Sequence, residues 1–170
     1  MRFSATEIAR VVGGDLVSGT TADADVAGVA IDSRSVSGGE LFVPIVAERD
    51  GHEFIAVAVA NGAVAYLTSN GRVPADGADG AAVAAVAIAV DDTGRALLEL
   101  GTAARSRLSA EVGDRVIGIT GSVGKTTVKD LTAAALAPRY TVQSSPRSFN
   151  NELGVPLTLA NSPDDVDAVV

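Results

Sequence analysis

The sequence predicts an α/β protein in which a small mixed α/β N-terminal domain is followed by the start of a second, parallel-sheet domain. Two observations support this prediction. Short runs rich in valine and alanine alternate with segments of helical periodicity over the first hundred residues. Further on, an apolar run at 116–119 leads through a glycine-rich turn into a helix-forming run at 128–136, which is the order of a parallel βα unit.

The N-terminal elements follow from local signals. Ser4 and Glu7 form a capping box that starts a helix, and Gly13 and Gly14 end it. A second helix is predicted over 52–61, where apolar residues recur at helical spacing. Apolar runs bounded by turn residues predict strands at 15–17, 26–31, 41–45, 63–68 and 82–90.

The second half is organised around a connecting helix. Asp91 and Asp92 can cap a helix that runs to about Leu108. We therefore divide the chain into a domain at 1–90, a connecting helix at 91–111 and a second domain at 112–170. Within the second domain we predict a strand at 116–119, a strand at 140–143, a helix at 154–160 and the first residues of a buried parallel strand at 167–170.

The composition excludes several classes of protein. The 170 residues include no cysteine, so a disulfide framework or a thiolate metal site is excluded. The formal charge of −8 argues against nucleic-acid binding. No apolar run approaches the roughly 18 residues that span a bilayer, so we expect no membrane insertion. We expect a cytoplasmic monomer.

The glycine-rich turn carries the chemistry of a phosphate-binding loop. Glycines let backbone N–H groups point into the turn, and the following helix N-terminus adds partial positive charge. Lys125 would reach the β- and γ-phosphates of a nucleoside triphosphate, and the Thr126 hydroxyl would face Mg²⁺. The predicted nucleotide-binding residues are Thr120, Gly121, Ser122, Val123, Gly124, Lys125, Thr126 and Thr127.

The spacing departs from the general phosphate-loop pattern. That pattern has a glycine five positions before Gly124, where this chain has Ile119. The alternative is an ordinary strand–turn–helix corner with a surface lysine. Local charge favours the phosphate loop, because residues 115–150 hold five basic residues and one acidic residue in an otherwise acidic chain. Chance clustering of the basic residues remains the alternative.

Other polar residues have simpler interpretations beside functional ones. His52 is the only histidine, so a metal role lacks partners and a structural hydrogen bond is the simpler interpretation. Ser33 and Arg34 could form an ordinary turn at a strand end. Asn150 and Asn151 could cap the helix that follows.

Several segments together resemble the Mur ligases. The phosphate loop at 118–127 looks like their ATP loop, which likewise lacks the first glycine of the general pattern. The segment at 148–159 is similar to that of the members that add D-alanyl-D-alanine. The N-terminal segments that resemble the family are 32–34, 39–43, 50–54 and 62–63.

This resemblance implies an ATP-dependent ligase that joins D-alanyl-D-alanine to a UDP-N-acetylmuramoyl-tripeptide through an acyl phosphate, in peptidoglycan precursor synthesis. It implies that the first domain is a substrate domain, with Ser33 and Arg34 at the uridine, and that the second opens an ATPase domain. Lys125 and Thr126 would be catalytic, with ATP and Mg²⁺ as cofactors. Asn150 and Asn151 would contact substrate or the ATP side of the site.

The sequence also leaves alternatives open. The chain lacks the family's Mg²⁺-binding glutamate, modified lysine and C-terminal domain, so we expect an N-terminal fragment that is inactive alone. A non-catalytic nucleotide-binding or UDP-sugar-binding module is one alternative. Another Mur-type amino-acid ligase is the second alternative.

Overall fold

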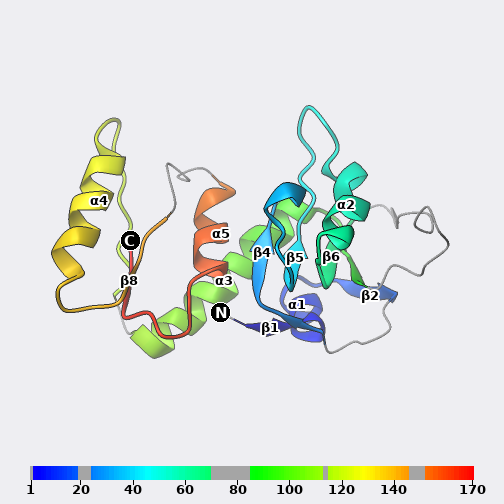
Figure 1. Cartoon of the computed structure of the whole chain (residues 1–170), viewed down its shortest axis with the longest axis horizontal. Helices are drawn as coiled ribbons and strands as arrows, with labels where there is room; N and C mark the ends of the chain where they lie inside the picture. Colours follow the sequence, from blue (N-terminus) through cyan, green and yellow to red (C-terminus); the bar gives the residue numbers. More distant parts are fainter. Residues whose placement is uncertain (1, 19–23, 70–84, 113–114, 146–151) are drawn as a thin grey trace. The chain divides into compact units, whose positions relative to one another are not determined.

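The computed structural model describes residues 2–18, 24–69, 85–112, 115–145 and 152–170. It divides into two compact units, Arg2–Leu100 and Gly101–Val170. The architecture is mixed α/β, as the sequence predicts, and Figure 1 shows the elements of each unit.

A five-stranded sheet forms the first unit, in the order β2-β7-β6-β5-β4. The four strands from β7 to β4 are parallel, and β2 is an antiparallel edge strand. The strands are β2 (Asp15–Ser18), β4 (Gly28–Ala30), β5 (Glu40–Phe42), β6 (Ala65–Thr68) and β7 (Val86–Ala89). Each predicted N-terminal strand therefore has a counterpart in the sheet, and residues 82–84 of the last predicted strand lie outside the described residues.

Short helices and a two-stranded ribbon complete this unit. Helix α1 (Ala5–Val11) begins at Ser4, whose Oγ accepts a hydrogen bond from the Glu7 N–H at 3.1 Å. A cap of this kind stabilises a helix by about 1 kcal/mol. The ribbon pairs β1 (Phe3–Ser4) with β3 (Asp25–Val26).

The predicted helix at 52–61 is wrong in one respect, because it is two elements. A 3₁₀ turn, η2 (Gly51–Phe54), precedes helix α2 (Ile55–Ala60). The Asp50 carboxylate accepts a hydrogen bond from the His52 N–H and caps the start of this 3₁₀ turn, which is wound more tightly than an α-helix. A second 3₁₀ turn, η1 (Ser33–Ser35), follows β4.

One part of the core lies between the sheet and α2. Phe42 and Tyr66 from the sheet pack with Ile55 and Ala58 of α2, and all four side chains are buried. All four residues of β6 are buried as well. Parallel strands covered on both faces have this continuous apolar character, which explains the valine- and alanine-rich runs of the sequence.

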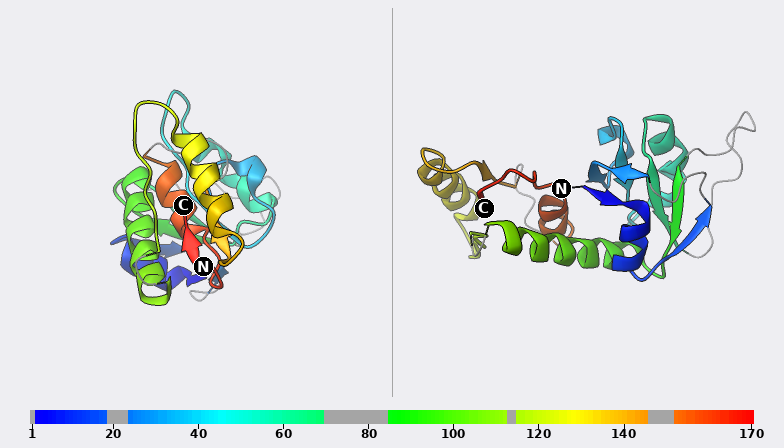
Figure 2. Two further views of the ribbon diagram at one scale, coloured as in Figure 1. Left: turned by 90° about the vertical axis from the view of Figure 1, so that its left-hand side faces the viewer. Right: turned by 90° about the horizontal axis from the view of Figure 1, so that it is seen from below.

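Helix α3 (Thr93–Val112) continues from the first unit into the second and is slightly longer than predicted (Figure 2, in green). Asp92 caps it, accepting the Arg95 N–H at 2.9 Å. In the second unit, Gly101 of α3 lies against Pro156, and a β-carbon at this glycine would come within 2.4 Å of the proline ring. A glycine is therefore required where α3 meets this neighbour.

The second unit contains a small parallel sheet and two further helices. Strand β8 (Val142–Gln143) pairs in parallel with β9 (Ala168–Val169), which confirms the predicted strand at the C-terminal residues. Helix α5 (Gly154–Ala160) has the predicted bounds. Helix α4 (Lys125–Leu136) begins at the lysine of the predicted phosphate loop.

The strand predicted at 116–119 is wrong as a regular strand. Val116 makes a single parallel bridge to Val169, and Ile117 is 37% exposed. Its partner β9 is only two residues long, so the ladder of hydrogen bonds extends no further along this segment. The direction of the segment is nevertheless the parallel one that the sequence predicts.

Packing differs between the two units. None of the twelve residues of α4, all of them described, is buried, and Leu131 is 66% exposed. Helices in proteins obtain most of their stability from a packed apolar face. Helix α4 is therefore held less firmly than the sheet of the first unit.

We predict slower amide hydrogen exchange in β5, β6 and β7 than in α4 and β8. The first set lies in a buried sheet, and the second set belongs to elements with few buried contacts. Exchange followed by mass spectrometry on peptides from 1–90 and 112–170 tests this. Equal protection in both regions would contradict it.

Candidate functional site

The predicted phosphate loop ends at the N-terminus of α4. Gly124 occupies the N-cap position with φ of +80°, a conformation that favours glycine. The Val128 N–H donates to the Gly124 carbonyl at 2.9 Å and makes the first bond of the helix. The N–H groups of Lys125, Thr126 and Thr127 come before it, and within the described residues no side chain caps them.

Lys125 folds back over this loop. Its Nζ donates to the Gly121 carbonyl at 2.6 Å, so the ammonium group remains at the loop. The residues around it, Thr120 to Gly124 and then Thr126 and Thr127, are exposed. The structure therefore combines exposed backbone donors, a helix N-terminus and a cation, which together suit an anion.

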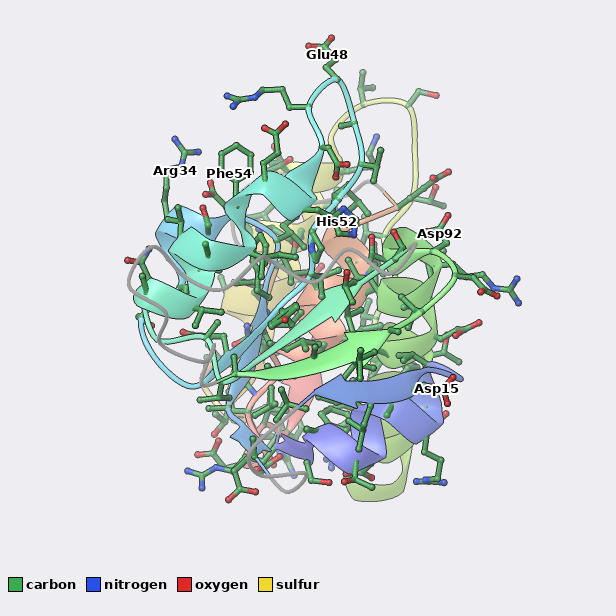
Figure 3. All side chains as sticks on the ribbon, turned by 90° about the vertical axis from the view of Figure 1, so that its right-hand side faces the viewer. Asp15, Arg34, Glu48, His52, Phe54 and Asp92 are labelled. Carbon is green, nitrogen blue, oxygen red and sulfur yellow. The ribbon has the colours of Figure 1, made fainter. Side chains whose placement is uncertain are left out.

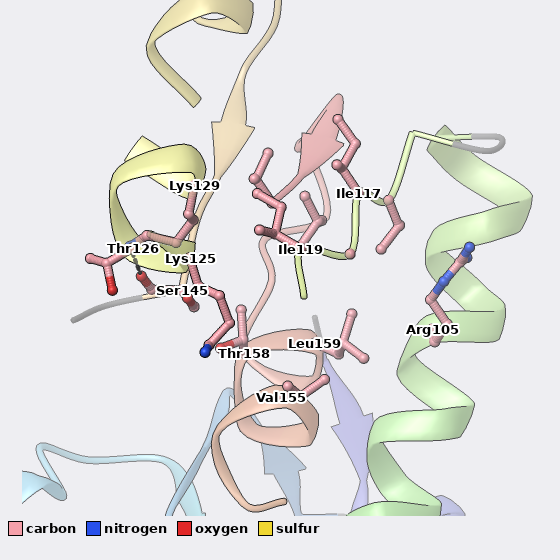
Figure 4. Close-up of a pocket in the computed structure, with 14 residues that line it drawn as sticks. Arg105, Ile117, Ile119, Lys125, Thr126, Lys129, Ser145, Val155, Thr158 and Leu159 are labelled. Atoms are coloured by element: carbon pink, nitrogen blue, oxygen red, sulfur yellow. Dashed lines mark hydrogen bonds between the residues drawn. The ribbon is translucent and has the colours of Figure 1, made fainter. Parts of the chain in front are cut away.

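A pocket of about 360 Å³ opens beside the loop. Figure 4 shows Lys125 and Lys129 on the same side of α4, with Lys125 extending toward α5. The opposite wall is mainly apolar. The lining residues named in Figure 4 are Arg105, Ile117, Ile119, Lys125, Thr126, Lys129, Ser145, Val155, Thr158 and Leu159.

The donor set fits a triphosphate with Mg²⁺. Phosphate oxygens match the uncapped N–H groups and the Lys125 ammonium. The Thr126 hydroxyl is exposed on the first turn of α4, where it can face a cation held by phosphates. Within the described residues, no group of three or more acidic, histidine or cysteine side chains could hold a metal ion alone.

The other predicted site residues form a turn in the first unit. The Asp32 carboxylate caps η1, accepting the Arg34 N–H at 3.0 Å, and also accepts the Arg34 Nη2 at 2.7 Å. These hydrogen bonds from Arg34 lower the pKa of Asp32 to about 2. Figure 3 shows Arg34 projecting from the surface, and its side chain is 86% exposed.

Ser33, unlike the exposed Arg34, faces the interior of the first unit. It is buried, and its carbonyl accepts a hydrogen bond from Asn61 Nδ2 at 2.9 Å. Asn61, which ends α2, therefore supports the turn from 28 residues away in sequence. Sequence reasoning missed Asn61, because no local pattern connects it to Ser33.

His52 has the structural role that its sequence context suggested. Its side chain is buried, with Nδ1 2.6 Å from Asp50 Oδ1. The Ser69 N–H donates to Nε2 at 3.1 Å, so Nε2 carries a lone pair and Nδ1 carries the proton. Burial lowers the pKa of His52, which agrees with a neutral ring. The side chain thus ties η2 to the end of β6.

Two further expectations concern other parts of the chain. Asn150 and Asn151 lie outside the described residues, so their predicted contacts remain predictions. Among the described helices, none combines the length and apolarity needed to cross a bilayer.

Sequence profiles of known families match most of the chain. The profile "Mur ligase family, catalytic domain" matches residues 25–105, and "Mur ligase middle domain" matches residues 119–170. The chain belongs to the Mur ligase family. The second match begins at the phosphate loop, and the first contains the 32–34 turn and His52.

Relatives of this Mur ligase chain are similar to it in sequence and in fold. The UDP-N-acetylmuramoyl-tripeptide–D-alanyl-D-alanine ligase of Bacillus subtilis is 39% identical over 96% of the chain and 34% of its own length. A crystal structure of MurF from Acinetobacter baumannii superposes with a TM-score of 0.80 at 26% identity, over 99% of this chain and 35% of that one. MurF from Thermotoga maritima, solved in complex with ADP, has a TM-score of 0.64 at 30% identity, covering 85% and 31%.

The chain corresponds to one part of these relatives. The Mur ligase chain described here spans about a third of the length of the curated relatives it matches. Their names describe whole ligases, and this chain matches about a third of each.

We predict that stability falls as the pH drops below about 6.5, the ordinary pKa of histidine. The folded pKa of His52 is lowered, so the unfolded chain binds the proton first and acid favours unfolding. The contribution of His52 is complete above that pH and is lost as the pH falls through the folded pKa. Urea unfolding between pH 7 and pH 5 measures this.

The variant His52→Gln is the control for this prediction. Glutamine does not titrate, so the decline in unfolding free energy between pH 7 and pH 5 should be smaller than in the original chain. An equal decline in both proteins would show that another group is responsible.

Proposed function

We propose that this chain forms the nucleotide-binding and UDP-binding part of an ATP-dependent ligase that adds D-alanyl-D-alanine to UDP-N-acetylmuramoyl-tripeptide. The observation that supports this most directly is the uncapped N-terminus of α4 with Lys125 folded over its loop. The ligase names of its relatives and the ADP bound to the Thermotoga structure agree with it.

Each residue of the loop has a role in this proposal. The N–H groups from Gly121 to Thr127 hold phosphate oxygens, and Lys125 exchanges its Gly121 carbonyl partner for them. The Thr126 hydroxyl orients Mg²⁺. ATP, when bound, supplies the phosphoryl group that activates the peptide carboxylate. The residues of the chain contribute positioning and fixed positive charge.

The turn at η1 is the proposed contact for the UDP end of the substrate. The Ser33 carbonyl accepts a hydrogen bond from Asn61, and the Asp32 carboxylate accepts one from the Arg34 N–H, so the backbone of the turn is held before any ligand arrives. A preformed site loses less conformational entropy on binding. In this proposal, residues 1–90 are the substrate domain and residues from 112 onward open the ATPase domain. Asn150 and Asn151 contact bound substrate, and the enzyme acts as a cytoplasmic monomer.

We predict that Lys125→Ala abolishes measurable ATP binding. Charge-assisted hydrogen bonds contribute about 1.5–3 kcal/mol each, so losing one contact of the ammonium weakens binding at least about tenfold, and losing two weakens it at least about a hundredfold. Calorimetric titration of the chain with MgATP measures the affinity. Arg139→Ala, which removes an exposed charge beyond α4, should bind like the original chain. Unchanged affinity in Lys125→Ala would count against the loop assignment.

The ligase reaction itself is tested on the full-length gene product. With ATP, Mg²⁺ and UDP-N-acetylmuramoyl-tripeptide present, we expect phosphate release when D-alanyl-D-alanine is added and none with single amino acids. Release with a single amino acid would indicate another Mur-type ligase. Nucleotide binding without any release would indicate a binding module.

A further inference from the structure

Both lysines of this chain line the same pocket. Of the 13 lysine and arginine residues in the sequence, only Lys125 and Lys129 are lysines. They are four residues apart, so they share one face of α4, and both line the same pocket. Every other lysine or arginine position holds arginine. The chain therefore places its two lysines, which have a compact ammonium on a flexible stem, at this pocket.

The two ammonium groups have different partners. Lys125 Nζ donates to Gly121 within the loop. Lys129 Nζ donates to the Ser145 carbonyl at 2.7 Å and lies 3.2 Å from Asp130 Oδ1, and its side chain is only 13% exposed. Both ammonium groups thus donate to a carbonyl, but Lys129 also has a carboxylate beside it and little exposure to solvent, which distinguishes it from a group that meets phosphate directly.

Ser145 connects Lys129 to the small parallel sheet. It lies just after the carboxyl end of β8, and its N–H donates to the Val170 carbonyl at 3.1 Å, just after β9. Lys129 thus joins the second turn of α4 to the carboxyl ends of both strands. Ligands of parallel α/β sheets bind outside this edge, so the link lies where α4 must be oriented.

We propose that Lys129 is a positioning residue of the nucleotide site. Through Ser145 it holds α4 against the carboxyl edge of the sheet, so that Lys125 and Thr126 face the pocket. The four-carbon stem lines the pocket while the ammonium reaches the Ser145 carbonyl. This inference rests on the proposed nucleotide site and assigns a role to a residue outside its loop.

Three variants test the role. Lys129→Met keeps the stem and removes the donor, Lys129→Arg restores a donor, and Arg139→Met removes an exposed positive charge outside the pocket. We expect MgATP affinity, measured by calorimetry on the 170-residue chain, to fall about tenfold in Lys129→Met. It should stay within threefold of the original in Lys129→Arg and in Arg139→Met. The thermal unfolding midpoints of the three variants should not rank in the same order as their MgATP affinities.

A measurement on the unsubstituted chain separates positioning from direct contact. Lysine labelled with ¹³C at Cε gives two side-chain NMR signals, and Lys129→Arg assigns them by removing one. On addition of MgATP we expect the Lys125 signal to shift, and the Lys129 signal to move much less because its ammonium keeps the Ser145 carbonyl.

The outcomes are distinct. Original affinity in Lys129→Met overturns the inference. The inference is also overturned if Arg139→Met loses as much affinity as Lys129→Met, or if the unfolding midpoint falls in parallel with affinity in both Lys129 variants. A Lys129 NMR signal that shifts as far as the Lys125 signal overturns it as well. If the original chain binds no MgATP, the proposed function fails and this inference fails with it. Binding that is lost in Lys125→Ala and retained in Lys129→Met overturns the inference alone.

Discussion

The parallel pairing between segment 115–117 and β9 is the constraint on which the site depends. The Ile117 N–H donates to Val169 at 2.8 Å, and the Val169 N–H donates to Arg115 at 3.0 Å. These bonds make the chain leave the sheet at the same edge as β8 and β9. The loop and α4 therefore begin beside the strand ends, and the lysines reach the pocket from there. A shift of register by one residue would turn the side chains of this segment to the other face.

Charge is used differently in the two units. In the first, arginines lie in exposed ion pairs such as Arg34 with Asp32 and Arg95 with Glu99, and pairs of this kind contribute little to stability. In the second, two lysines occupy one pocket beside a helix N-terminus. An acidic protein can thus present a local positive site to an anion while its net charge stays negative.

Local signals predicted the elements that local hydrogen bonds determine. Ser4 and Asp92 start their helices as predicted, because a cap needs only a residue three positions away. The helix at 154–160 has its predicted bounds. The predictions were wrong where contacts with residues distant in the sequence determine the conformation. Segment 116–119 is an incomplete strand because its partner is short, and residues 51–54 form a 3₁₀ turn because Asp50 and Ser69 hold His52.

The sequence by itself determined the chemistry of the loop and the resemblance to the Mur ligases, because glycines, lysine and threonines at fixed spacing are a local property of the chain. Only the tertiary structure showed that Asn61 supports Ser33, that Ser69 fixes the tautomer of His52, and that Lys129 reaches Ser145. These partners are 28, 17 and 16 residues apart. Contacts at such separations arise when packed elements meet, so the spacing of residues along the chain does not encode them.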